Sequence, residues 1–310
     1  MKKFLIAAAA GALALVTACA TAKENTAASP SAAVAAQPAL WVVRDADSTI
    51  YLYGTIHLRK AGSAWGGPVA ERALDEAQEV WTEIDMDPAK EAAMQGLVVR
   101  YGFDTAKPLS SKVTPTRWTQ IQTSAAKLGV PAANLEPMRP WLASLTFSML
   151  PMMKAGYDPA AGVDRSIDRI ARAGGKTMRA FETAEQQLQF FANFSEEMQL
   201  QMLYESLDEM EKGVEGLAAM ERAWEKGDDR ALATEMVAEM AHDYPQLYDV
   251  LLKRRNAAWV DTLSNELKGS GVDFVAVGAA HLAGPDSVQA LLAARRLPGV
   301  TIERVTPAPY

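Results

Sequence analysis

Short apolar runs of strand length, bounded by turn-forming residues, recur along the chain and predict the strands of a sheet. Two of them, Trp41–Arg44 and Thr49–Tyr53, flank a polar segment and together predict a β-hairpin. Further strands are expected at 79–85, 176–181, 273–277 and 301–305. Helical stretches separate most of these strands. The alternation favours an α/β fold with a largely parallel central sheet flanked by helices.

Apolar residues at helical spacing, often starting at a proline, predict the helices between the strands. These helices are expected at 68–78, 88–100, 115–128, 140–154, 162–173 and 286–295. From Ala184 to Lys268 the pattern is helical almost throughout, with breaks at Gly227 and Pro245. We therefore expect a helical block, at about 184–268, inserted into the α/β domain.

One apolar stripe in this block recurs in steps of three, four and seven residues. It consists of Leu203, Leu207, Met210, Val214, Leu217 and Trp224. Apolar side chains at helical spacing usually face a core, and we interpret the stripe in that way. The alternative is a groove that grips a peptide.

The first 18 residues have the pattern of an export signal rather than of a fold. Two lysines precede an apolar run, 4–16, that is too short for an ordinary transmembrane helix. The segment Val16–Cys19 then resembles a lipobox and ends in the single cysteine of the chain. We interpret 1–18 as a lipoprotein signal peptide and Cys19 as the lipid attachment site. A plain signal peptide, with Cys19 there by accident, is the alternative.

Residues 19–38 are mostly Ala, Ser, Thr, Pro and Gln, the composition of a flexible tether, and the folded domain is expected at 39–310. No aspartate follows Cys19, so there is no signal for retention at the inner membrane. The protein is therefore expected to be exported and anchored by lipid in the cell envelope, at the outer membrane facing the periplasm.

The composition is that of an ordinary globular protein, with 49% hydrophobic and 22% charged residues. Removing Lys2 and Lys3 from the 31 basic residues leaves 29 against 38 acidic residues, a formal charge of −9. The sequence has no basic cluster with interleaved aromatic residues. Nucleic acid is therefore not an expected partner.

Two of the three histidines, His57 and His281, each stand three residues after a glycine that ends a predicted strand. Chance would give two such matches about one time in a hundred at ordinary glycine frequency. The carboxyl ends of strands in open α/β sheets form the crevice where ligands bind. Two imidazoles there could share a metal ion or an acid–base task, whereas a lone histidine would more often be a structural one.

Carboxylates occupy comparable places in two other strands. Glu83 lies near the end of the apolar strand 79–85, where a charge is costly to desolvate unless it is paired or bound to a metal. Glu182 follows the strand 176–181 and could instead begin the next helix. Asp85 is interpreted as the cap of the helix 88–100.

These residues carry a resemblance to a known family. Gly54–Leu58 and Val277–Leu282, with Glu83 between them, resemble the signature of the TraB/PrgY/GumN family, which includes the animal TIKI Wnt proteases. Smaller matches are Arg139-Pro140-Trp141, Gly162-Val163-Asp164, Phe181-Glu182-Thr183, Arg255-Asn256 and Gly284. Together the matches extend from Leu40 to Val305. The family in turn resembles a wider group with erythromycin esterase and the haem-binding ChaN.

The resemblance implies a site, because TIKI-type members are described as metal-dependent proteases in which the two histidines and a glutamate are essential. It implies catalytic roles for His57, Glu83, His281 and Arg255, with Asn256 as a further contributor. It implies a divalent ion, Mn, Co or Zn, held by His57, His281, Glu83 and Glu182. Arg255 would suit a carboxylate or an oxyanion, although it could also be a surface arginine of the basic run 253–255.

Two functions are consistent with these observations. The first is a metal-dependent hydrolase, a peptidase by resemblance, whose ion polarises a carbonyl and activates water, with Glu83 as ligand or general base. The second is an envelope protein without catalysis that sequesters a peptide, haem or polysaccharide precursor. The partners expected are thus a peptide or other small substrate and, through Cys19, a lipid membrane.

Replacing Cys19 with Ser is expected to abolish lipid attachment, because only the thiol can carry the lipid. Metabolic labelling with a radioactive fatty acid measures this directly. Label incorporated equally by the wild type and Cys19→Ser would refute the anchor.

Overall fold

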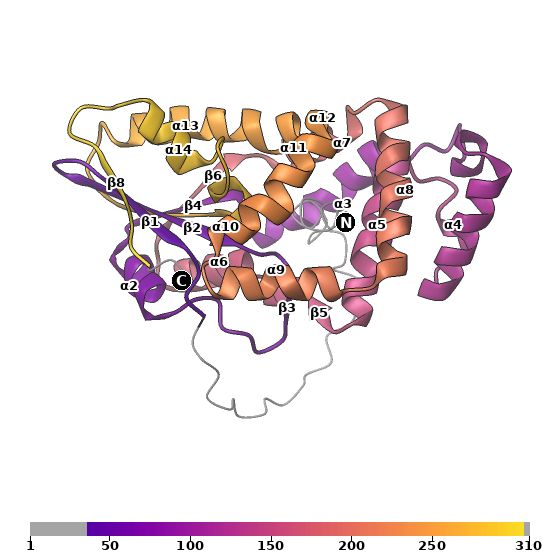
Figure 1. Cartoon of the computed structure of the whole chain (residues 1–310), viewed down its shortest axis with the longest axis horizontal. Coiled ribbons are helices and arrows are strands. Elements are labelled where there is room, and N and C mark those ends of the chain that lie inside the picture. The colour runs from indigo at the N-terminus through magenta and orange to yellow at the C-terminus, as the bar shows by residue number, and fades with distance from the viewer. Residues whose placement is uncertain (1–35, 307–310) are drawn as a thin grey trace. The chain divides into compact units, whose positions relative to one another are not determined.

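The computed structural model describes residues 36–306 and contains one sheet of six strands (Figure 1). The strand order is β6-β4-β7-β2-β1-β8. The strands are β1 (Leu40–Arg44), β2 (Ser48–Thr55), β4 (Glu79–Ile84), β6 (Thr177–Glu182), β7 (Gly271–Gly278) and β8 (Thr301–Arg304). The neighbours β6, β4, β7 and β2 are parallel, whereas β1 pairs antiparallel with β2 and β8. The predicted α/β class with a largely parallel sheet is confirmed. The two-residue strands β3 (Arg59–Lys60) and β5 (Tyr157–Asp158) were not predicted.

The described chain divides into two compact units. The helical unit contains residues 87–157 and 184–217, and the sheet unit contains residues 36–86, 158–183 and 218–306. The segment 184–268 is therefore divided between the two units. Helices of the helical unit are α3 (Pro88–Gly102), α4 (Pro115–Leu128), α5 (Pro140–Lys154), α7 (Ala184–Ala192) and α8 (Glu196–Lys212).

The remaining α-helices within residues 36–306 belong to the sheet unit. They are α2 (Pro68–Glu76), α6 (Val163–Ala173), α9 (Glu215–Glu225, which begins at the boundary), α10 (Asp229–Leu232), α11 (Glu239–Asp243), α12 (Pro245–Tyr248), α13 (Arg254–Glu266) and α14 (Val288–Ala294). In Figure 1, α13 and α14 lie on one side of the sheet, and α2 and α6 lie on the other.

The alternation of side chains along the strands divides the core of the sheet unit into two layers. Ile50, Leu52 and Val275 face α13 and α14, where they pack with Trp259 and Leu292. The residues between them, such as Tyr51, Tyr53 and Phe274, point to the other face and are also buried. Because both faces are covered, the central parallel strands β2 and β7 contain continuous apolar runs, at 50–53 and 274–277.

The parallel pair β2 and β7 brings the two Gly-x-x-His segments side by side. Gly54 is paired with Val277, and Thr55 is paired with Gly278. A Cβ atom on Gly54 would lie 3.0 Å from the Cα atom of Ala279, so a glycine is needed for close approach of the two strand ends. The carboxyl ends of the strands meet at one edge of the sheet, as the sequence predicted.

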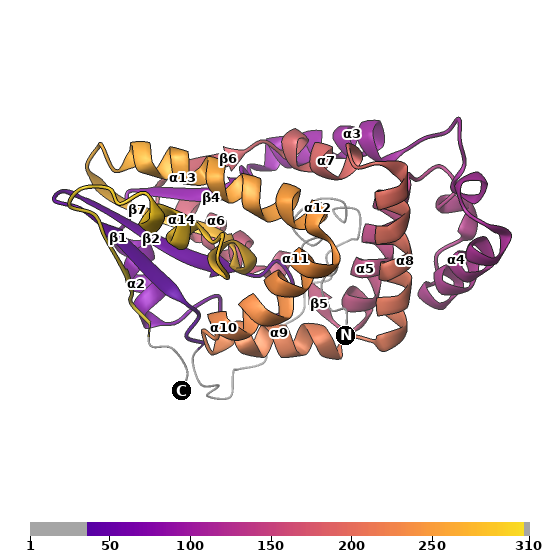
Figure 2. The same cartoon turned by 45° about the horizontal axis from the view of Figure 1, so that its top comes forward.

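The helical unit has its own core, built around α5 and α8, which run side by side in Figures 1 and 2. Leu203 and Leu207 of α8 are fully buried in it, so the core interpretation of the apolar stripe is confirmed for these residues. The stripe does not continue along one helix, because α8 ends at Lys212, before Gly213 with a φ of 77°. Trp224 belongs to the sheet unit and contacts Tyr53.

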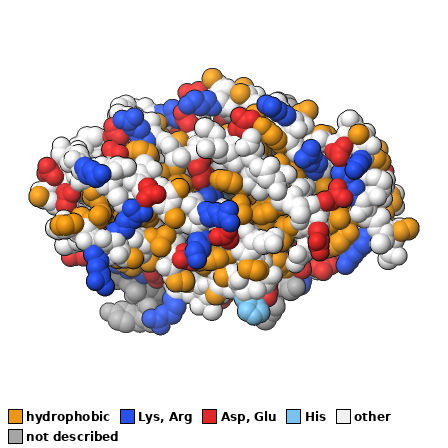
Figure 3. Space-filling model, turned by 90° about the horizontal axis from the view of Figure 1, so that it is seen from above, with side chains coloured by type: hydrophobic (Ala, Val, Ile, Leu, Met, Phe, Trp, Pro, Cys, Tyr) orange, Lys and Arg blue, Asp and Glu red, His pale blue; other side chains and the backbone are white. Residues whose placement is uncertain are grey.

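Charged side chains of both signs occur over the face seen in Figure 3, with basic residues lying among acidic ones. Within residues 36–306, no helix is long and apolar enough to cross a membrane. The predicted signal peptide, Cys19 and nearly all of the predicted tether lie outside the described residues.

Replacing Gly54 with Ala is expected to destabilise the protein by about 1–3 kcal/mol, because the new methyl group would press on the backbone of Ala279. Gly96→Ala is the matched control. Gly96 is an exposed position within α3 where a Cβ would meet no atom within 4 Å, so this change should be neutral or slightly stabilising. Urea unfolding measures both. Equal stability of the two variants would contradict the close approach.

Candidate active site at the carboxyl ends of the parallel strands

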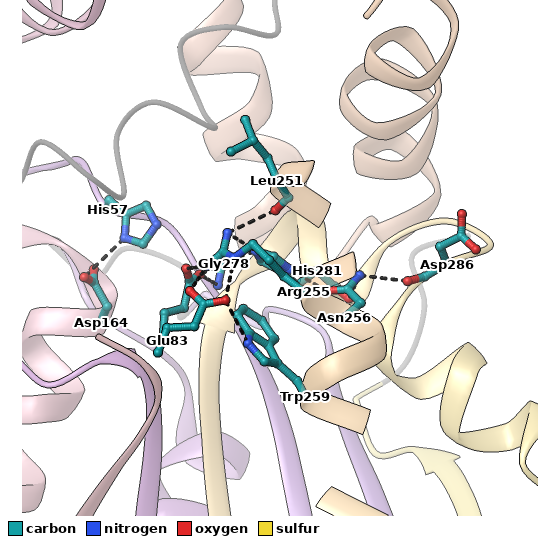
Figure 4. A network of polar contacts seen from close by, with 11 residues as sticks. His57, Glu83, Asp164, Leu251, Arg255, Asn256, Trp259, Gly278, His281 and Asp286 are labelled. Carbon is teal, nitrogen blue, oxygen red and sulfur yellow. Dashed lines mark hydrogen bonds and ion pairs between the residues drawn. The ribbon is translucent and has the colours of Figure 1, made fainter. Parts of the chain in front are cut away.

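Each of the four parallel strands contributes one polar side chain at the same edge of the sheet. In sheet order, Glu182 ends β6, Glu83 lies near the end of β4, His281 follows β7 and His57 follows β2. Their side chains are 9%, 12%, 5% and 14% exposed, respectively. The structure therefore brings together the predicted histidines and glutamates in a nearly buried group. Figure 4 shows His57, Glu83 and His281 of this group.

Arg255 of α13 lies in the middle of this group. Its Nη2 atom donates to Glu83 Oε2 at 2.5 Å and to Glu182 Oε2 at 2.8 Å, and its Nε atom donates to Glu182 Oε1 at 2.8 Å. The Arg255 side chain is 10% exposed, whereas those of Lys253 and Arg254 are 55% and 73% exposed. Arg255 is thus a buried partner of two carboxylates and not part of a basic surface run.

The surroundings of Arg255 hold its guanidinium in place. A π-helical segment, Asp249–Lys253, precedes α13, and the carbonyl of Leu251 within it accepts a hydrogen bond from Arg255 Nη1 at 3.0 Å. One turn further along α13, the ring of Trp259 lies 4.8 Å from the guanidinium carbon. Its Nε1 atom donates to Glu182 Oε1 at 3.0 Å. Trp259 was not predicted from the sequence, although its i+4 spacing from Arg255 places it on the same helix face.

His281 is held as a neutral imidazole. Asn256 Nδ2 donates to the carbonyl of Asp286 at 2.7 Å, which leaves Asn256 Oδ1 as the acceptor for His281 Nδ1 at 2.5 Å. His281 Nε2 is then the unprotonated nitrogen, and it lies 3.2 Å from Arg255 Nη1. Burial, followed by the positive charge of Arg255, lowers the pKa of His281 to about 3.

His57 is held in the opposite protonation state. Its Nδ1 atom lies 3.2 Å from Oδ2 of Asp164, in the first turn of α6. Burial opposes the charge on the ring, but the carboxylates of Asp164 and Glu83 outweigh it and raise the pKa of His57 to about 9. At neutral pH, His57 is therefore an imidazolium ion. No role was predicted for Asp164 from the sequence, although it stands in the short match Gly162-Val163-Asp164.

Glu83 lies between the two histidines. Its Oε1 atom accepts from the backbone N–H of Gly278 at 2.8 Å and lies 3.8 Å from His281 Nε2. A Cβ atom on Gly278 would lie 3.1 Å from Glu83 Oε1 and 3.7 Å from His57 Nε2, so both atoms face the same bare glycine. Burial disfavours the charge on Glu83, yet Arg255 and then the histidines hold the pKa of this carboxyl well below its usual range.

The expected divalent ion can be tested against these contacts. Both oxygens of Glu182, one oxygen of Glu83 and Nε2 of His281 already contact the Arg255 guanidinium. A metal ion bound by the same atoms would lie beside this permanent positive charge. Among residues 36–306, no group of three or more His, Cys, Asp or Glu side chains has an arrangement for a metal ion. In this arrangement the donor set does not fit the expected ion.

The cap predicted at Asp85 is wrong. Asp87 instead caps α3, accepting from the N–H of Ala89, because the helix begins one residue after it. Asp85 forms an ion pair with Arg172 at 2.6 Å. His242, the third histidine, is 88% exposed and pairs with the neighbouring Asp243, so it takes no part in the site.

Comparison with known proteins agrees with the motifs at this site. Residues 39–304 match the model of the TraB/PrgY/gumN family. An uncharacterized protein of Treponema pallidum (strain Nichols) is 21% identical over 269 residues, which cover 83% of this chain and 80% of that protein. No solved structure matches this chain significantly.

The His57–Asp164 pair predicts a pH-dependent contribution to stability. Because the pKa of His57 is raised to about 9 in the folded protein, this contribution is fully present below the unfolded value of about 6.5 and is lost as the pH rises through 9. Asp164→Asn should thus cost on the order of 3 kcal/mol at pH 6 and much less at pH 10. Urea unfolding at both pH values measures the difference. A cost that is the same at pH 6 and pH 10 would count against a charged His57.

Proposed function

Because this chain belongs to the TraB/PrgY/gumN family, we propose that it is a hydrolase whose site is the group around His57, Glu83 and His281. One observation carries the proposal. Two histidines from the same motif lie on either side of an ionised glutamate, and their surroundings hold one protonated and the other neutral. Environments that separate the pKa values of neighbouring groups in this way are typical of acid–base catalysis.

His57 is the proton donor in the proposed reaction. Asp164 stabilises its imidazolium form and orients the ring, as a carboxylate does for the histidine of other hydrolases. When water attacks the carbonyl carbon of the substrate, His57 gives its proton to the leaving group. The proton released by the attacking water then restores the imidazolium. One water is consumed, and the enzyme returns to its starting state.

Glu83 orients the attacking water in this scheme. Arg255 keeps the pKa of Glu83 low, so this carboxylate stays ionised and can accept a hydrogen bond from the water without taking its proton. Its Oε1 atom is fixed by the N–H of Gly278 beside His57 Nε2. His281, through its contact with Arg255 Nη1, helps to hold the guanidinium that fixes Glu83.

Peptides are the substrate class that we propose, and the support for this choice is the resemblance of the motifs to those of TIKI-type proteases. The location that we propose is the cell envelope, with the chain anchored by lipid at Cys19. The support for the anchor is the lipobox pattern Val16–Cys19, and the lipid-labelling experiment described above tests it.

Digestion of a peptide library by the purified protein tests the hydrolase proposal. His57→Gln is expected to lower the cleavage rate about 10²–10⁴-fold, because the proton donor is lost. Glu83→Gln should also remove most of the activity, since the water loses its acceptor. The matched control is His242→Gln, which changes an exposed histidine outside the site and should keep the wild-type rate.

The pH dependence gives a second measurement on the same substrate. The rate should fall as the pH rises through about 9, because His57 loses the proton that it must donate. Peptide that is bound but never cleaved would favour the alternative of a sequestering protein. Full activity of His57→Gln would overturn the proposal.

A further inference from the structure

The Arg255 guanidinium has an acceptor for each of its five N–H groups. Two of these acceptors are oxygens of Glu182, one is an oxygen of Glu83, one is the Leu251 carbonyl and one is His281 Nε2. This is the full hydrogen-bonding capacity of a guanidinium. The Arg255 side chain is only 10% exposed, so these contacts replace its hydrogen bonds to water and differ from an ion pair at the surface.

Three of the partners of Arg255 are residues that were expected to bind a metal ion: Glu83, Glu182 and His281. The contacts to Glu182 are two parallel N–H to oxygen bonds, the geometry in which a planar guanidinium recognises a carboxylate. The atoms that would have to turn toward an ion are therefore engaged by a cation that cannot lose its charge. A second cation at the same atoms would be repelled by it.

The aromatic side chain beside the guanidinium gives an independent observation. The ring of Trp259 lies 4.8 Å from the guanidinium carbon of Arg255 and 4.3 Å from the ring of His281. A flat organic cation is stabilised by such a ring face, whereas a small divalent ion requires oxygen, nitrogen or sulfur ligands. Trp259 itself is fixed because its Nε1 atom donates to Glu182.

We infer that Arg255 is the resident cation of this site and stands where a divalent metal ion was expected. It positions Glu83 and Glu182 on two neighbouring strands and meets His281 Nε2 from the third. The site is thereby assembled by the docking of α13 on the sheet, and it needs no bound metal ion. This inference rests on the contacts of Arg255 and holds whether or not the protein is a hydrolase.

The metal content of the purified full-length protein tests the inference. The protein is dialysed against Mn²⁺, Co²⁺ or Zn²⁺, one at a time, then against metal-free buffer, and measured by mass spectrometry of the elements. We expect well below one ion per chain in the wild type. One ion per chain that is lost in His57→Ala or His281→Ala would overturn the inference. An ion retained equally by both variants would lie outside the site, and this result would agree with the inference.

Thermal unfolding in metal-free buffer gives a second test, with a neighbouring residue as the control. Arg255→Met should lower the Tm by several degrees or prevent folding, because two buried carboxylates lose their counter-charge. Arg254→Met, at a side chain that is 73% exposed, should leave the Tm unchanged. The double variant Arg255→Met, Glu182→Met also removes one of the two unpaired carboxylates. Its Tm should therefore be higher than that of Arg255→Met alone. Equal Tm values for Arg255→Met and Arg254→Met would overturn the inference.

The two proposals can fail separately. A protein that cleaves peptides and also holds one ion per chain at His57 and His281 would overturn the inference and keep the hydrolase. A metal-free protein that cleaves no peptide would keep the inference and overturn the hydrolase.

Discussion

The site is organised around one ion-pair group. The carboxylates of Glu83 and Glu182 are buried side by side at the end of the parallel sheet, and the Arg255 guanidinium bonds to both. Glu83 and Glu182 lie on the neighbouring strands β4 and β6, where two negative charges removed from water would repel each other. Arg255 bonds to both and is itself buried. Removing one member of such a buried group is costly, because the others keep their charge without a partner. The site is therefore complete only when α13 is packed on the sheet.

The same edge of the sheet gives two equivalent motifs opposite properties. His57 and His281 follow the adjacent parallel strands β2 and β7, and each stands three residues after a glycine. Their Nδ1 atoms meet different partners: a carboxylate of Asp164 for His57, and a neutral amide of Asn256 for His281. The carboxylate stabilises the imidazolium of His57, whereas burial and the nearby positive charge of Arg255 favour the neutral ring of His281. At neutral pH the pair therefore presents one charged and one neutral imidazole at the same sheet edge.

Much of the fold was predictable because its signals are local. Apolar runs of strand length, bounded by turn-forming residues, identified all six strands of the sheet. Helical spacing that starts at a proline gave the bounds of α4 and α5 as the structure has them. The sheet edge that carries the site was predictable as well, since parallel strands place their carboxyl ends together. By contrast, the apolar stripe from Leu203 to Trp224 did not reveal that it belongs to two units. Hydrophobic spacing records burial but not the core in which a residue is buried.

The sequence by itself determined the α/β class, the largely parallel sheet, and the convergence of His57, Glu83 and His281 at one edge, whereas it left the place of Glu182 open. These properties follow from hydrophobic periodicity and from the direction of the strands, and both can be deduced from local sequence patterns. The tertiary structure alone decided that Glu182 faces Arg255, that Asp164 stands behind His57 and that Asp85 pairs with Arg172. Each of these pairs joins residues more than seventy positions apart, so it depends on how helices dock on the sheet. Protonation states follow from those contacts, and no local pattern carries them.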